Sequence, residues 1–209
     1  MLIIIKYRRT MNKIKFFLIK PKVVIVIGES EENKSSSFPF AVARERQKMV
    51  KEAIFQVLKQ YFKLDKDVLI FETEEKEINK FAFYLKNSKL PILVITGIND
   101  IYLVKNLPVN THFVLNYDDE KAKEINNLDN FKTMKFGFKE ENDIFASDIK
   151  ENGGTNFKVN YNGKSVPFWL DGLLGQEQIY AILAAISVGT ILGLNLVEIS
   201  QSFKYRAFA

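Results

Sequence analysis

Short apolar runs alternate with amphipathic stretches along the first two thirds of the chain. Residues 23–27 are five β-branched apolar residues followed by Gly28, as expected for a strand buried on both faces of a sheet. Residues 44–62 then carry apolar side chains at helical spacing, with lysines and arginines on the other side. Further strands are predicted at DVLIFE, LPILVIT and HFVLNYDD, and helices around residues 78–85 and 119–125. This order predicts an α/β fold, a mostly parallel sheet with helices on both faces.

The pattern changes near residue 132. Residues 143–170 alternate between apolar and polar positions around Gly-Gly and Asn-Gly turns, which predicts an antiparallel β segment. A long apolar helix should follow from about residue 176, and a short one from about residue 196. We expect a basic lead-in at 1–20 and one domain at 21–209. Within that domain the β-rich part covers about 132–172 and the C-terminal helices cover 176–203.

Composition removes several classes of function. The chain has no cysteine and a single histidine, His112, which excludes disulfides, cysteine-ligated zinc and any mechanism with two imidazoles. Much of the net charge of +5 lies in the first 22 residues, and elsewhere basic residues mix with acidic ones, so nucleic acid is not an expected partner. The N-terminal apolar runs are broken by basic residues and are too short to span a membrane. They predict an amphipathic lead-in, with membrane-surface contact as the alternative, on a cytoplasmic protein.

The stretch GESEENKS, residues 28–35, has the spacing of a phosphate-binding loop. It matches G-x-x-x-x-G-K-[ST] except that Asn33 replaces the second glycine. In such a loop Lys34 would neutralise the terminal phosphates and the Ser35 hydroxyl would hold Mg²⁺. Three glutamates in the same stretch and an early Pro39 oppose this interpretation. A phosphate site and an acidic surface loop both stay open on the loop alone.

Polar residues also follow the predicted strands at the edge where ligands of open α/β sheets bind. Glu72 closes DVLIFE and is either a magnesium ligand or a solvated carboxylate. Asn116 could hydrogen-bond a base edge. Asp118 and Asp119 come next, and at least one of them is expected to cap the following helix.

Taken in order, these pieces resemble the central, ATP-binding domain of the Mur ligases, which build the peptide stem of peptidoglycan, and are most like the member that adds D-alanyl-D-alanine. The resemblance runs from about residue 20 to the C-terminus. It is carried by IGESEENKSS, VKEAIFQVLKQYFKL, VITGIND, LNYDD, FGF and the glycine-started helix with YAILAA.

The resemblance implies roles for single residues. Lys34 and Glu72 would be catalytic, and Ser35 and Glu72 would hold Mg²⁺. ATP would be bound by Gly28, Asn33, Lys34, Ser35, Asn116 and Asp119. The implied activity is ATP-dependent amide-bond formation through an acyl phosphate, with a UDP-linked muramyl peptide and an amino acid or dipeptide as substrates.

The chain also departs from the family pattern. Asn33 replaces a glycine, Gly97 replaces the asparagine of a Thr-Asn pair, and Glu177 replaces a histidine. The family's two flanking domains do not fit in this length. Two alternatives follow: a non-catalytic relative that binds a nucleotide or a partner protein, and a fragment of a longer ligase.

Overall fold

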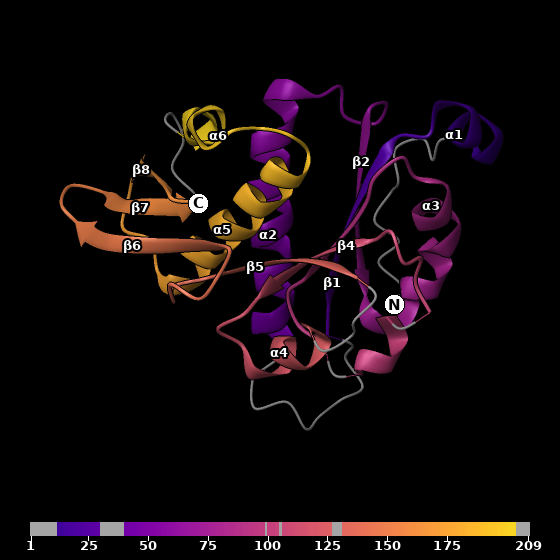
Figure 1. Cartoon of the computed structure of the whole chain (residues 1–209), viewed down its shortest axis with the longest axis horizontal. Helices are drawn as coiled ribbons and strands as arrows, with labels where there is room; N and C mark the ends of the chain where they lie inside the picture. The colour runs from indigo at the N-terminus through magenta and orange to yellow at the C-terminus, as the bar shows by residue number, and fades with distance from the viewer. Residues whose placement is uncertain (1–11, 30–39, 99, 105, 127–130, 204–209) are drawn as a thin grey trace.

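One eight-stranded sheet organises the part of the chain that the computed structural model describes, residues 12–29, 40–98, 100–104, 106–126 and 131–203. The spatial order is β2-β1-β3-β4-β5-β6-β7-β8 (Figure 1). The strands are β1 Lys22–Gly28, β2 Val68–Glu74, β3 Pro91–Ile95, β4 His112–Asn116, β5 Lys132–Gly137, β6 Ile144–Glu151, β7 Thr155–Tyr161 and β8 Lys164–Leu170. Pairing is parallel from β2 through to β6, and β7 and β8 continue the sheet as antiparallel strands.

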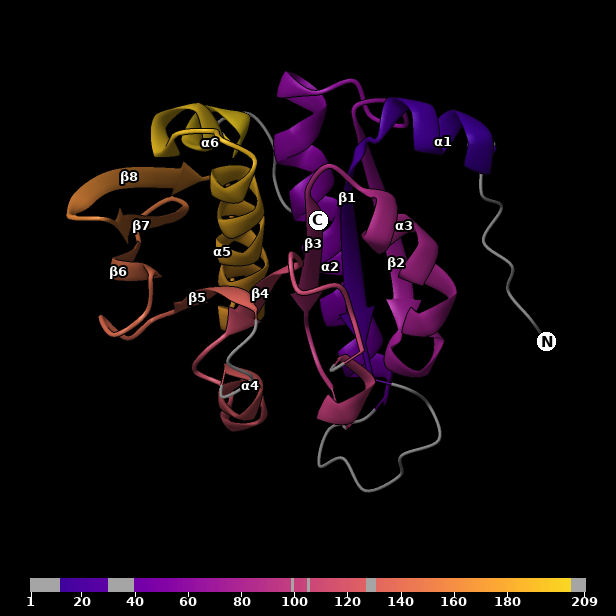
Figure 2. The ribbon, with the colours of Figure 1, turned by 45° about the vertical axis from the view of Figure 1, so that its right-hand side comes forward.

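Helices cover both faces of the sheet, as Figures 1 and 2 show. One face packs against α2, α5 and α6, and the other against α1, α3, α4 and the 3₁₀ helix η1. The bounds are α1 Lys13–Ile19, α2 Phe40–Tyr61, η1 Glu75–Phe81, α3 Ala82–Asn87, η2 Ile101–Val104, α4 Glu120–Asn126, α5 Gln176–Ile191 and α6 Leu196–Phe203. The predicted α/β class, with its antiparallel segment, is confirmed.

The alternation within β1 divides the core into two layers. Val24 and Val26 pack on the α2 and α5 side, whereas Val23, Ile25 and Ile27 pack on the α1 and α3 side. All five side chains are fully buried. The apolar run therefore indicates a strand that is covered on both faces, as expected for a parallel strand in an α/β sheet.

Three local features differ from the expectation. The helix predicted at 78–85 is a 3₁₀ helix followed by the short α3, and the Ala82 N–H bonds to Asn79 O in the i→i+3 pattern. Strand β2 extends to Glu74, so Glu72 lies two residues before its end, opposite Val26. Helix α2 begins four residues earlier than predicted, which carries its first turns past the carboxyl edge of the sheet.

Candidate functional site

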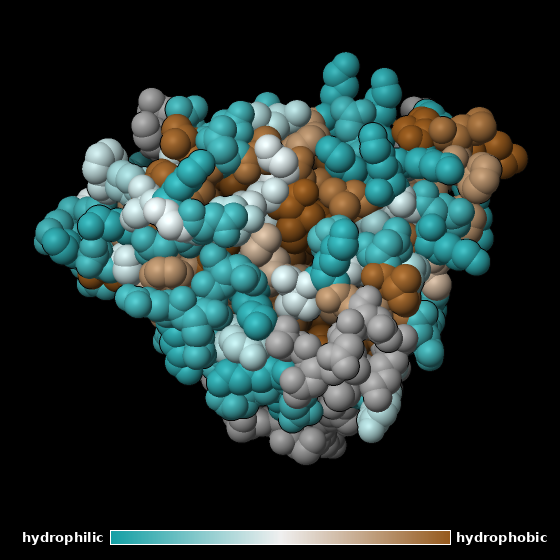
Figure 3. All heavy atoms as spheres, in the orientation of Figure 1, coloured by the Kyte–Doolittle hydropathy of each residue, from teal (hydrophilic) through white to brown (hydrophobic). Residues whose placement is uncertain are grey.

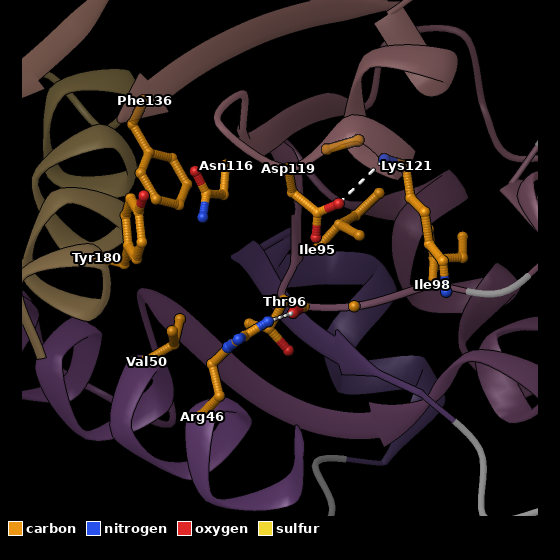
Figure 4. A pocket seen from close by; sticks show the side chains of 12 residues that line it. Arg46, Val50, Ile95, Thr96, Ile98, Asn116, Asp119, Lys121, Phe136 and Tyr180 are labelled. Atoms are coloured by element: carbon orange, nitrogen blue, oxygen red, sulfur yellow. Dashed lines mark hydrogen bonds between the residues drawn. The ribbon is translucent and has the colours of Figure 1, made fainter. Parts of the chain in front are cut away.

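The carboxyl ends of β3 and β4, the start of α4, strand β5 and helices α2 and α5 surround a small cavity (Figure 4). Its enclosed part measures about 20 Å³, which is room for about one water molecule. The lining residues are Arg46, Val50, Ile95, Thr96, Gly97, Ile98, Asn116, Asp119, Lys121, Ala122, Phe136 and Tyr180. A nucleotide base would need this cavity to open.

Glu72 is engaged by a cation from α2. The Lys51 Nζ lies 2.7 Å from Glu72 Oε2, and both side chains are partly buried, at 35% and 19% exposed. The even-numbered residues of β2 face α2, so the carboxylate points toward the helix. The position predicted for a magnesium ligand is therefore occupied by an ion pair.

Gln47 covers the carboxyl ends of β1 and β2. Its Nε2 donates to Val26 O at 3.0 Å and to Thr73 O at 2.7 Å. A Cβ at Gly28 would lie 3.0 Å from the Gln47 side chain, so the glycine makes this approach possible. Gly28 thus serves the packing of α2 on the strand end in the described structure.

Arg46 joins α2 to α5 and to the end of β3. Its Nε and NH2 donate to the two carboxylate oxygens of Glu177 at 2.6 and 2.9 Å, a bidentate pair, and NH1 donates to Thr96 O at 3.4 Å. Glu177 lies in the first turn of α5, where the helix dipole favours a carboxylate. Glu177, where the resemblance leads us to expect a histidine, is thus matched by an arginine.

The turn after β4 is held by its own polar side chains. Asn116 Oδ1 accepts from the Asp118 N–H at 3.2 Å, and Asp119 Oδ1 accepts from the Lys121 N–H at 3.0 Å, which caps α4. Figure 4 shows the Asn116 amide directed into the cavity, between Phe136 and Asp119. Asn116 and Asp119 therefore share one cavity, and the expected cap is Asp119.

Asp118 ties this turn to β5 and α5. Its Oδ2 accepts from the Phe138 N–H at 2.7 Å and from the Tyr180 hydroxyl at 3.1 Å. Burial of the phenol, followed by the nearby Asp118 carboxylate, raises the pKa of Tyr180 to about 12. The ring of Tyr180 also contacts Phe138, with 4.7 Å between centroids, so an aromatic wall closes this side of the cavity.

The described residues contain no cluster of acidic or imidazole side chains that could hold a metal ion. Among the described residues, no group of three or more His, Asp or Glu side chains is placed to hold a metal ion. Glu72 is the one predicted metal ligand that can be located, and Lys51 neutralises it. The other predicted site residues, Asn33, Lys34 and Ser35, lie outside the described residues.

Sequence reasoning missed the cations that α2 supplies. Arg46 and Lys51 were expected on the solvent side of this helix, yet both reach polar groups at the sheet edge. A signal was available: Arg46 and Gln47 precede the buried Val50 and Ile54 by four and seven residues, which extends the buried stripe toward the helix start.

Known proteins resemble this chain in sequence over its second half and in structure over most of its length. Residues 99–189 match the family model of the Mur ligase middle domain. A UDP-N-acetylmuramate–L-alanine ligase from Caldicellulosiruptor bescii is 31% identical over 100 residues, which are 47% of this chain and 22% of that ligase. The predicted phosphate loop lies outside the matched family segment.

Two solved structures illustrate the likeness in fold. MurF from Acinetobacter baumannii has a TM-score of 0.67 at 13% identity and covers 94% of this chain and 48% of that one. MurF ligase from Thermotoga maritima, in complex with ADP, has a TM-score of 0.64 at 18% identity, covering 90% and 50%. The chain thus spans about half of these structures and about a fifth of the curated ligase. The resemblance predicted from the sequence is confirmed.

Proposed function

We propose that this chain, a relative of the Mur ligases through their middle domain, provides the nucleotide-binding part of an ATP-dependent amide-bond ligase in peptidoglycan precursor synthesis. One observation carries the proposal. The structure brings Asn116, Asp119 and the glycine-started helix α5 to the carboxyl edge at which β1 ends in Gly28. That edge is where open α/β sheets bind nucleotides.

The reaction would proceed through two transfers. A substrate carboxylate attacks the terminal phosphorus of ATP, which gives an acyl phosphate and releases ADP. The amine of an amino acid or dipeptide then attacks the acyl carbon, phosphate leaves, and the amine loses a proton as the amide forms. A UDP-linked muramyl peptide is the carboxylate substrate that the family relationship suggests.

The chain's own residues would position the nucleotide. In this proposal Lys34 neutralises the transferring phosphoryl group, the usual main contribution of a protein to such steps. The Asn116 amide, which points into the cavity, holds the base. Mg²⁺ would add charge neutralisation, but Glu72 becomes available to it only when Lys51 moves away.

Calorimetric titration of ATP tests the nucleotide site directly. Wild type, Lys34→Ala and the control Lys164→Ala, which lies on the β7–β8 hairpin, would each be titrated with and without Mg²⁺. We expect micromolar binding that Lys34→Ala abolishes and Lys164→Ala preserves. Absence of heat with millimolar ATP, in a sample that melts cooperatively, would refute the proposal.

A second function is favoured by the ion pairs at the edge. Two carboxylates and two cations that a catalytic site would direct at its substrates are paired with each other instead, as Lys51–Glu72 and Arg46–Glu177. This arrangement suits a relative that keeps the fold without catalysis and works by docking to another protein. ATP binding that is unchanged by Mg²⁺, with no ATP hydrolysis when flanking Mur ligase domains are added, would support it over the first.

A further inference from the structure

Helix α1 presents an uncovered apolar face. Phe16 is its buried side chain and packs edge-on against Tyr84, with ring centroids 5.0 Å apart. Ile14 and Leu18 are 71% and 77% exposed, and Phe17 is 53% exposed. Figure 3 shows hydrophobic atoms gathered at the corner where Figure 1 places α1.

The geometry of the helix separates this face from the body of the protein. Each residue turns the helix by about 100°, so Ile14 and Leu18 point roughly 160° away from Phe16. They lie four residues apart and therefore beside one another, with Phe17 adjoining. Phe16 packs the helix on the body of the protein, and Lys13 Nζ also lies 5.2 Å from the centroid of the Phe83 ring. The opposite side of the helix faces solvent.

Positive charge surrounds the apolar face. Lys13 and Lys15 flank it on either side by the same helical count, and both are exposed. At the C-terminal end of α1, the exposed Lys20 is joined by Lys89, whose N–H bonds to the carbonyl of the residue after Lys20. The helix itself contains no acidic residue.

Basic residues are also concentrated near the N-terminus of the sequence. The first 22 residues hold seven basic residues and no acidic one. Because the whole chain has 30 basic and 25 acidic residues, the remainder holds 23 and 25. The sequence after residue 22 is slightly acidic, and the excess positive charge lies in α1 and the sequence on either side of it.

We infer that α1 is a membrane-surface contact whose partner is an anionic lipid bilayer. An apolar helix face between lysines matches the boundary between acyl chains and negative headgroups, into which the apolar side inserts while the lysines meet the headgroups. Lysine stems also extend along such a boundary and keep their charge in water.

The contact is independent of the nucleotide site. Helix α1 immediately precedes β1 and so lies at the amino edge of the sheet, whereas Gly28 and Asn116 lie at the carboxyl edge. A chain bound through α1 would hold the cavity on the side away from the lipid. Membrane binding can therefore succeed or fail whatever the result of the ATP titration.

Vesicle co-sedimentation of the full chain tests the inference. One set of vesicles is phosphatidylcholine alone, and the other is equal parts phosphatidylcholine and phosphatidylglycerol. We expect wild type to bind the anionic vesicles preferentially and to lose binding at high salt. Leu18→Ser should weaken binding about tenfold and Lys15→Ala about fivefold.

Matched control variants distinguish binding through the apolar face of α1 from non-specific binding of the protein to vesicles. Leu173→Ser and Lys164→Ala remove an equally exposed leucine and an exposed lysine elsewhere, and both should bind like wild type. Thermal melts of all variants should coincide, because the altered side chains are exposed. Equal binding to both vesicle types, or equal loss in Leu173→Ser, would overturn the inference. So would a dimer in light scattering that Leu18→Ser dissociates while no vesicles are bound, because a second copy would then cover the face.

Discussion

The Arg46–Glu177 pair should couple α2 to α5 by about 1–2 kcal/mol of unfolding free energy. Exposed ion pairs contribute about 0.2–1 kcal/mol, and charge-assisted hydrogen bonds shielded from water contribute more. This pair lies between the two cases, since it makes two bonds of 2.6 and 2.9 Å with side chains 22% and 36% exposed. Because the glutamate is partly exposed, we expect a coupling energy near the lower end of the range for buried pairs.

A double-mutant cycle measures the coupling. Wild type, Arg46→Met, Glu177→Gln and the double variant would be unfolded in urea at neutral pH. Arg46→Met should cost more than Glu177→Gln, because the arginine also donates to Thr96 O. In thermal melts each 1 kcal/mol corresponds to about 2–4 °C for a chain of this size.

The cycle also gives a clear refutation. Single effects that add to the double effect within about 0.3 kcal/mol would show that the two side chains do not stabilise each other. The ion pair would then contribute nothing to stability, and the presence of a glutamate at position 177 would need another explanation. The exposed Lys48–Glu52 pair, 3.8 Å apart on α2, is the matched control and should show coupling near the weak end of the surface range.

Three further substitutions test the carboxyl edge. Lys51→Met leaves the Glu72 carboxylate without its cation, so the free energy of unfolding should fall by about 1–2 kcal/mol and millimolar Mg²⁺ should restore part of it in thermal melts. Gly137→Ala places a Cβ 2.6 Å from the Asp118 carboxylate and should cost about 1–3 kcal/mol in urea unfolding. Tyr180→Phe removes a hydroxyl bonded to Asp118 and should cost about 1–2 kcal/mol at neutral pH. The pKa of Tyr180 is about 12 in the folded state and 10 ordinarily, so the neutral phenol favours the folded state. This contribution to stability is fully present below pH 10 and is lost as the pH rises through 12.

Each of these substitutions has its own control. Lys48→Met removes a largely exposed lysine from the same helix and should leave both stability and the response to Mg²⁺ unchanged. The added Cβ would also lie 2.6 Å from Asn142 Nδ2, so Gly137→Ala should cost less in a background with both Asp118→Ala and Asn142→Ala. An equal cost in that background would contradict the steric reason. Tyr161→Phe alters a partly exposed tyrosine of β7, and a loss as large as that of Tyr180→Phe would rule out the hydrogen bond to Asp118 as the cause.

The sheet was predictable because its signals are local. A run of β-branched residues at 23–27 specifies a strand covered on both faces, and alternation with helical segments specifies parallel pairing. Topology then places the residues after β4 at the carboxyl edge, so the sequence alone predicts that Asn116 and Asp119 lie there, as they do in the structure.

The partners of the site residues were not predictable in the same way. Periodicity assigns one face of α2 to the core, but it does not say where the sheet ends beneath the helix. Beyond that end, a side chain on the flank of the buried stripe meets strand termini and loops rather than solvent. Arg46 is in this position, because it donates to Thr96 O just after β3 ends. Lys51 instead reaches Glu72, which lies inside β2 on the strand's α2 side.

The contacts of α2 give Glu177 and Glu72 a different interpretation from the one that the sequence suggests. From the sequence, Glu177 is expected to replace a histidine and Glu72 to be a magnesium ligand. In the structure each of these two carboxylates has a cation from α2, so each pair carries no net charge. A bound polyphosphate would draw the same cations, because Arg46 and Lys51 lie at the edge where it would bind. Nucleotide binding would then break both ion pairs and free both carboxylates. ATP should therefore reduce the coupling energy measured in the Arg46–Glu177 cycle. If the chain binds no nucleotide, the coupling energy should be the same with and without ATP.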